Sequence, residues 1–136
     1  MQTGLPVSIT FKDGKLQTVA RETAIRVNSE GNAWLEAHRG KPGINVTGHW
    51  YEKAWGTLNL EQDEATGDVI GSSNDYDLTG IVNGKKLYLI LGYTAKFRND
   101  YSAVLVLNGE SALEGKHESG LMKDEGKGRS MSLVKR

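Results

Sequence analysis

The 136-residue chain contains no cysteine, only two prolines and no long apolar run. The absence of cysteine excludes disulfides, zinc thiolate sites, iron–sulfur clusters and a cysteine nucleophile. Few prolines together with seventeen glycines are typical of short strands joined by tight turns. The longest dense apolar run, Lys85 to Tyr93, is far shorter than the roughly 18 residues that a spanning helix needs. We therefore expect one domain that does not span a membrane.

Neither sign of charge predominates, because seventeen Lys and Arg residues balance seventeen Asp and Glu residues. A neutral chain has no built-in attraction for a polyanion, so nucleic acid is not an expected partner. Apolar residues make up 38% and charged residues 25%, which is typical of a folded globular protein rather than a disordered one. No signal segment is visible, so a cell-envelope or secreted location would require that one has been removed. The compartment otherwise stays open.

The sequence also lacks a catalytic or metal-binding constellation. His38, His49 and His117 are far apart and have no metal-type spacing. The acidic segments 63–68 and 73–77 do not match the twelve-residue calcium loop with its terminal glutamate. No serine has a Gly-x-Ser-x-Gly setting. We therefore expect no enzyme activity, no metal and no cofactor.

Turn signals at regular intervals divide the chain into short alternating segments. Asp13-Gly14, Asn83-Gly84 and Asn108-Gly109 each supply a glycine where a two-residue hairpin turn needs a positive φ. Between the turns apolar and polar residues alternate, as in Trp55 to Gln62, where Leu58 and Leu60 share one face. The pattern predicts about ten strands, the signature of an all-β sandwich or barrel.

Consecutive hairpins favour an up-and-down order, and pairing the first strand with the last removes both exposed edges. We therefore predict an all-β fold, an antiparallel up-and-down β-barrel of about 8–10 short strands. The whole chain, 1–136, is expected to form a single domain. It consists of an N-terminal hairpin section, 1–44, and a barrel meander, 45–136.

The N-terminal section is the ambiguous part of the chain. Its second hairpin is predicted to have arms at Ala24–Val27 and Ala33–Ala37, joined by a turn at 28–32. Segment 15–27 also fits helical spacing, although its β-branched residues lower helix propensity. Strand and helix both stay open for this segment.

Two segments resemble conserved blocks of lipocalins. Asn45 to Ala54 (NVTGHWYEKA) is similar to the first block, a Gly-x-Trp on the opening strand, and Arg98 to Leu107 (RNDYSAVLVL) resembles the second, an Asp-Tyr leading into a strand. The resemblance covers at most residues 45–136 and implies a calycin-like barrel, the class of lipocalins, avidins and fatty-acid-binding proteins. It further implies that Trp50 plugs one barrel end beneath a basic side chain, here Arg129 or Arg136.

The predicted function is non-enzymatic binding of a small apolar or amphipathic molecule in the barrel cavity. The candidate ligand-binding residues combine aliphatic walls with aromatic groups: Trp55, Leu58, Leu60, Tyr76, Leu78, Leu89, Leu91, Tyr93, Tyr101 and Leu105. Trp55 is equally compatible with a core position, and the tyrosines with cross-strand pairing on the sheet surface. The alternative function is a filled barrel that acts as a protein–protein interaction or enzyme-inhibitor module through its loops, especially 119–129.

A second apolar face is predicted on the two most hydrophobic strands. It consists of Tyr88, Ile90, Val104 and Val106, which alternate with the leucines assigned to the interior. An apolar face of this kind must be covered. The pattern therefore predicts either a cap from residues 1–44 or a homodimer.

Overall fold

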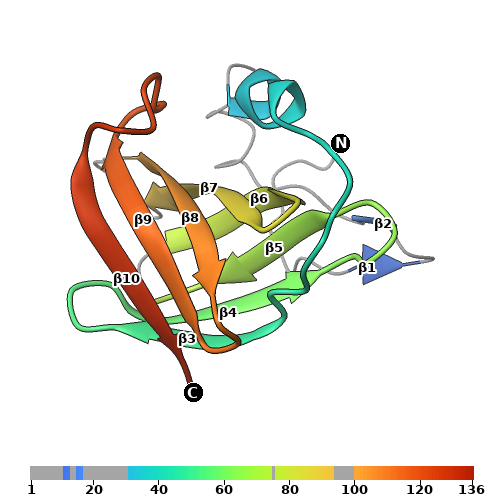
Figure 1. The fold of residues 1–136 in the computed structure, drawn as a ribbon, viewed down its shortest axis with the longest axis horizontal. Helices are drawn as coiled ribbons and strands as arrows, with labels where there is room; N and C mark the ends of the chain where they lie inside the picture. Colours follow the sequence, from blue (N-terminus) through green and yellow to red (C-terminus); the bar gives the residue numbers. More distant parts are fainter. Residues whose placement is uncertain (1–10, 13–14, 17–30, 75, 94–99) are drawn as a thin grey trace.

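Eight antiparallel strands form a closed barrel in the computed structural model of the chain (Figure 1). The model describes residues 11–12, 15–16, 31–74, 76–93 and 100–136, and for 11–12, 15–16 and 93 the backbone alone. The barrel strands are β3 (Gly48–Glu52), β4 (Gly56–Gln62), β5 (Asp68–Ser72), β6 (Tyr76–Asn83), β7 (Lys86–Tyr93), β8 (Tyr101–Asn108), β9 (Ala112–Ser119) and β10 (Arg129–Lys135). Their order, β10-β3-β4-β5-β6-β7-β8-β9, confirms the predicted all-β, up-and-down barrel.

Pairing of the first and last barrel strands closes the structure. Trp50 on β3 lies opposite Lys135 on β10, and Tyr51 lies opposite Val134. In Figure 1 the red C-terminal strand β10 reaches β3 and completes the ring. Closure leaves no barrel strand with an unpaired edge, which is the physical reason that favours this arrangement over an open sheet.

The predicted turns are found where glycine supplies the required backbone. Gly84 between β6 and β7 has φ +63°, and Gly109 between β8 and β9 has φ +72°. Near the N-terminus, β1 (Phe11–Lys12) pairs antiparallel with β2 (Lys15–Leu16), as the first predicted hairpin requires.

Three glycines let neighbouring strands approach closely inside the barrel. Gly71, Gly80 and Gly115 each lie opposite an inward-facing leucine or valine on a neighbouring strand. At each position an added Cβ would overlap a backbone carbonyl oxygen of that neighbouring strand, and at Gly115 it is that of Val104. Glycine within a strand often marks such a close approach or a tight bend, so these residues permit the strong curvature of a small barrel.

Alternation along the strands places one set of apolar side chains inside the barrel. These residues form one contiguous buried core, and each is at most 4% exposed: Val46, Trp50, Leu58, Leu60, Val69, Leu78, Val82, Leu87, Leu89, Leu91, Ala103, Leu105, Leu113, Met131 and Leu133. Much of the barrel interior is therefore occupied by the chain's own side chains.

The predicted strand at Ala33–Ala37 is wrong, because residues 31–37 form a short helix. The helix lies outside the barrel (Figure 1), and its Leu35 and Trp34 pack on the outer face of β7 and β8. Ala33, Leu35, Glu36 and Ala37 are strong helix formers, and packing of the apolar side of the helix on this sheet face stabilises an element too short to persist alone. The other predicted arm, Ala24–Val27, and most of segment 15–27 lie outside the described residues.

The outer apolar face is thus capped from within the N-terminal 44 residues, one of the two predicted solutions. Leu35 forms a second buried cluster with Ile81, Tyr88, Ile90, Val104 and Met122. Val106, predicted on the same face, stays 39% exposed. Among the described residues no helix is long and apolar enough to cross a membrane.

The β9–β10 connection, the loop expected to be available for partners, contributes to this cap. Met122 is only 3% exposed, and Leu121 packs against the same cluster. The Ser102 hydroxyl donates to Gly120 O (2.7 Å) and accepts from Met122 N (2.8 Å), which fastens the loop to β8. Lys86 pairs with Glu125 at 2.9 Å. The apolar residues of this loop, Leu121 and Met122, therefore pack within the domain, against the outer cluster.

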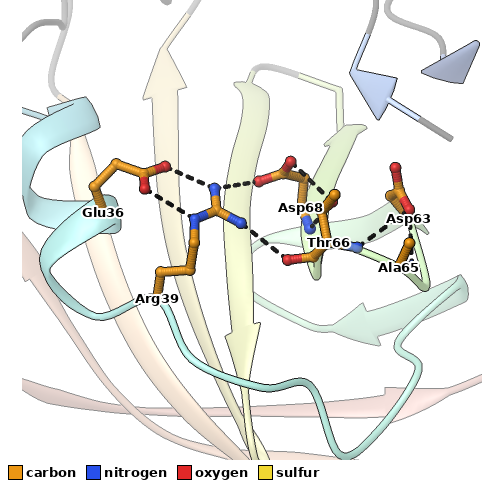
Figure 2. Close-up of polar contacts among 6 residues, drawn as sticks. All are labelled: Glu36, Arg39, Asp63, Ala65, Thr66 and Asp68. Carbon is orange, nitrogen blue, oxygen red and sulfur yellow. Dashed lines mark hydrogen bonds and ion pairs between the residues drawn. The ribbon is translucent and has the colours of Figure 1, made fainter.

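A clamp around Arg39 ties the end of the helical segment to the β4–β5 turn (Figure 2). The Arg39 guanidinium binds both carboxylate oxygens of Glu36, the Asp68 carboxylate and the Thr66 carbonyl. These partners raise the pKa of Arg39, and the hydrogen bonds that Arg39 donates to Glu36 have the largest effect. In the turn, Asp63 Oδ1 accepts from Ala65 N at 2.9 Å. The clamp fixes the position of Arg39, just after the helix, relative to the β4–β5 turn. From this point the chain continues across the end of the barrel.

Candidate functional site

One end of the barrel is closed by Trp50 and by the segment that precedes β3. Trp50 is 1% exposed, and its indole N–H donates to Val46 O at 2.9 Å. The buried side chain of Gln62 holds the same segment, since its Oε1 accepts from Val46 N and its Nε2 donates to Ile44 O, both at 2.8 Å. Val46 N, Val46 O and Ile44 O are thus hydrogen-bonded within the protein, and these bonds hold the segment before β3 across this end of the barrel.

The basic residue over Trp50 is Lys135, not Arg129 or Arg136 as the lipocalin resemblance implied. Lys135 Nζ lies 5.6 Å from the Trp50 ring centroid. Arg136, one residue further along the chain, lies over Tyr51, which alternates with Trp50 and faces outward. Arg129 begins β10 at the opposite end of that strand, where it pairs with His117. Side chains along β10 alternate between the two faces of the strand, and this alternation turns Lys135 inward, toward Trp50.

Four aromatic rings meet at the opposite end of the barrel, and we call them the aromatic cluster: Trp55, Tyr76, Tyr101 and His117. The Trp55 ring centroid lies 5.1 Å from that of Tyr76, and 5.2 Å from those of Tyr101 and His117. Trp55 belongs to the β3–β4 turn, whereas its three neighbours lie on β6, β8 and β9. One tryptophan therefore contacts rings from three separate strands, which only barrel closure can bring together.

The members of the aromatic cluster are half-buried. Each has part of its surface in solvent, and Trp55, Tyr76 and Tyr101 pack below against the buried barrel core. The core thus forms an apolar floor, and the rings form the accessible layer above it. Aromatic and apolar surface with a few polar groups is the usual composition of small-molecule sites.

Three polar side chains at this barrel end have buried atoms without a hydrogen-bond partner in the part of the chain that is described. These atoms are Glu52 Oε1, His117 Nδ1 and, in the β5–β6 connection, Ser73 Oγ. Glu52 alternates with inward-facing Trp50 on β3. Its backbone carbonyl accepts from Trp55 N at 3.1 Å, so Glu52 is the residue at which the turn that carries Trp55 begins. A buried polar atom without a partner is uncommon and calls for an explanation, such as a bound water, ion or ligand.

Burial shifts the pKa of Glu52 and the pKa of His117, each in the direction that favours the neutral form of the group. Desolvation raises the pKa of Glu52. The pKa of His117 is lowered, chiefly by burial and further by the positive charge of Arg129, against a smaller opposing effect of the Arg129 backbone. Burial disfavours the charged form of any ionisable group, so His117 is the neutral imidazole at neutral pH.

The structure brings three of the predicted ligand residues together at the surface of this end: Trp55, Tyr76 and Tyr101. The predicted wall leucines all lie in the buried core beneath them: Leu58, Leu60, Leu78, Leu89, Leu91 and Leu105. The backbone of Tyr93 pairs with Tyr76, but its side chain lies outside the described residues.

The chain has no significant match among protein-family models, curated proteins or solved structures. The described residues also contain no group of three or more acidic or histidine side chains arranged to hold a metal ion.

Sequence reasoning overlooked Glu52 and His117. Both carried a usable signal, because each lies an even number of residues from an inward-facing neighbour on its strand, Glu52 from Trp50 and His117 from Leu113. Strand alternation therefore points both inward. Their shared barrel end is set by the tertiary closure.

Proposed function

We propose that this protein is a non-enzymatic binding protein that holds one small amphipathic molecule at the aromatic cluster. The observation that carries the proposal is the convergence of Trp55 with Tyr76, Tyr101 and His117, at a barrel end where buried polar atoms lack partners among the described residues. The rings supply apolar contact area, and the polar atoms supply directional groups. A ligand that joins both would complete the hydrogen bonding of this end.

Apolar contact would provide most of the affinity. A ligand that buries about 150 Å² of apolar surface gains about 4 kcal/mol at about 25 cal/mol per Å². Part of this gain offsets the loss of translational and rotational freedom on association. The buried core below the rings limits how deep a ligand can enter, so the proposal favours a compact molecule at the barrel end over a long chain threaded through the barrel.

Binding is favoured over catalysis because of the surroundings of His117. Among the described side chains, its Nδ1 makes no hydrogen bond to a hydroxyl or carboxylate. To act as the general base for a nucleophile, His117 would need the nucleophile's hydroxyl within hydrogen-bond reach. We propose the absence of enzyme activity on this ground.

We further propose that the barrel is calycin-like. This is supported by the position of Trp50 on the first strand of an eight-stranded meander and by the cation, Lys135, over its ring. The polar closure of that end by Gln62 is consistent with a barrel that admits ligands from the aromatic end.

The alternative, a filled barrel that acts as a protein–protein interaction module, is supported by one observation. All six predicted wall leucines are buried in one contiguous core, as a barrel without a ligand site would have. The two proposals differ in what the aromatic cluster does: in the first it changes on addition of a small molecule, and in the second it does not.

NMR of the three tryptophan indole N–H groups tests the proposal, because two of them are already bonded within the protein. Trp34 donates to Met122 O and Trp50 to Val46 O. Laurate, retinol, haem and 2-naphthol are titrated in turn, and we expect at least one to shift the Trp55 signal and to raise the melting temperature. Trp55→Phe identifies its signal and should abolish the response.

Trp34→Phe is the matched control, since Trp34 lies in the outer cluster, and this variant should respond as the unmodified protein does. A Trp55 signal that stays fixed with every probe would overturn the ligand proposal and favour the interaction module. A response confined to Trp34 would place binding outside the barrel and would equally contradict the proposal.

A further inference from the structure

The inward side of the aromatic end carries a negative charge that the described residues do not compensate. Glu52 Oε1 is buried and has no hydrogen-bond partner among them, and desolvation raises its pKa. Burying a carboxylate oxygen without a partner is unfavourable, because its lost hydration is not replaced. A ligand that brought a positive charge would remove this penalty.

Among the described residues, three cations lie on β10 or directly after it: Arg129, Lys135 and Arg136. Arg129 affects the pKa of His117 and has no resolved effect on that of Glu52. Lys135 and Arg136 lie at the other end of β10, over Trp50 and Tyr51. The carboxylate therefore has no competing partner among these three residues.

The neighbours of Glu52 favour an organic cation over a bare metal ion. Trp55, three residues further along the same hairpin, contacts two tyrosine rings at centroid distances of 5.1 and 5.2 Å. The faces of Trp and Tyr rings attract ammonium groups, with estimated gains of about 0.5–2 kcal/mol. A metal ion would need several oxygen or nitrogen ligands, and the described residues provide no such group.

We propose that the ligand of the aromatic cluster is a small organic ammonium ion, with its amine at Glu52 and its apolar body against Trp55, Tyr76 and Tyr101. The inference rests on the proposed function, and it names the chemical class of the ligand. The neutral imidazole of His117 lies across the cluster, 5.2 Å from Trp55 between ring centroids. Since neutral histidine carries one donor and one acceptor nitrogen, it can bond a second polar group of the ligand without repelling its charge.

A series of three probes with the same apolar body and different head charge tests the proposal: 2-phenylethylammonium, 2-phenylethanol and 3-phenylpropionate. We expect the ammonium to bind the full-length protein about tenfold or more tightly than the alcohol, and the carboxylate to bind most weakly. Dissociation constants are measured by calorimetry at pH 7. The position of each probe is monitored by the Trp55 indole signal.

Glu52→Gln is the decisive variant, because it keeps the shape and removes the charge. We expect it to abolish the preference for the ammonium and to leave affinity for the alcohol within about twofold. Glu61→Gln is the matched control, since Glu61 is exposed on the neighbouring strand β4, and it should retain the preference. A second measurement follows the pKa of Glu52 by NMR of its carboxyl carbon. Saturation with the ammonium should lower this pKa.

Each outcome has a definite meaning. A preference for the ammonium that disappears in Glu52→Gln supports the inference. Equal or tighter binding of the alcohol or the carboxylate, with the Trp55 signal shifting, overturns it and leaves the proposed function standing. Failure of all three probes to bind, with Trp55 unresponsive to every other probe as well, overturns both.

Discussion

Replacing Leu35 by alanine should destabilise the whole domain, although Leu35 lies outside the barrel. Its side chain is 5% exposed and packs with Tyr88, Ile90 and Val104 on the outer face of β7 and β8. A buried Leu→Ala change costs about 2–5 kcal/mol, and a site at the edge of a domain should fall in the lower half of this range. We therefore expect a loss of about 2–3 kcal/mol, a large share of the roughly 5–15 kcal/mol that stabilises a typical protein.

Urea denaturation followed by circular dichroism measures this loss. If the urea slope stays constant at about 1.5–2 kcal/mol per molar, the midpoint should move down by about 1–2 M. Asn32→Ala is the matched control, because Asn32 is exposed on the same helix and surface changes usually stay within about 0.5 kcal/mol. Equal midpoints for the two variants would show that the helix does not cover the barrel in solution.

A charged substitution at the same position extends the test to association. Leu35→Glu should displace the helix and expose Ile90 and Val104, which are at most 6% exposed in the intact cap. An exposed apolar face of this kind promotes association, so sedimentation velocity should show a concentration-dependent increase in mass. A variant that stays as monodisperse as the unmodified protein would contradict the role of the helix as a cap.

Two further predictions concern the barrel itself. Gly115→Ala should cost about 3 kcal/mol in the free energy of unfolding, because its Cβ would overlap Val104 O. Gly109→Ala, with φ +72° and open space around it, should cost only about 1 kcal/mol, and equal costs in urea would contradict the close-approach argument. The lowered pKa of His117 means that the unfolded chain takes up this proton first, so stability should fall as the pH drops through about 6.5 toward the lower folded value. His117→Gln should flatten the melting temperature between pH 7 and 5, and an unchanged profile would argue that His117 is not buried as a neutral group.

Much of the barrel was predictable because strands and hairpin turns are local. Alternation in Trp55 to Gln62 and the glycines at 84 and 109 contain the information for register and turn, and the structure has both. The helix at 31–37 was not predictable in the same way. Its Ala, Leu and Glu residues favour a helix, but a segment this short is not stable alone. The outer face of β7 and β8 stabilises it by offering Leu35 and Trp34 a surface to bury.

The candidate site, like the fold, was predictable from the sequence only in part. Trp55, Tyr76 and Tyr101 could be chosen from the sequence because aromatic residues on short strands are natural binding groups. Glu52 and His117 gave no signal of joint function, since 65 positions separate them in the chain. No local pattern specifies which barrel end a residue will share with another.

The amino-acid sequence by itself determined the all-β class, the meander order and the two faces of each strand, because these follow from residue periodicity and turn chemistry. Only the tertiary structure decided that Lys135 covers Trp50, that a helix caps the outer face, and that Trp55 meets rings from three other strands. These contacts depend on how far the barrel strands shift past one another at closure. That shift is set by the packing of all inward side chains together.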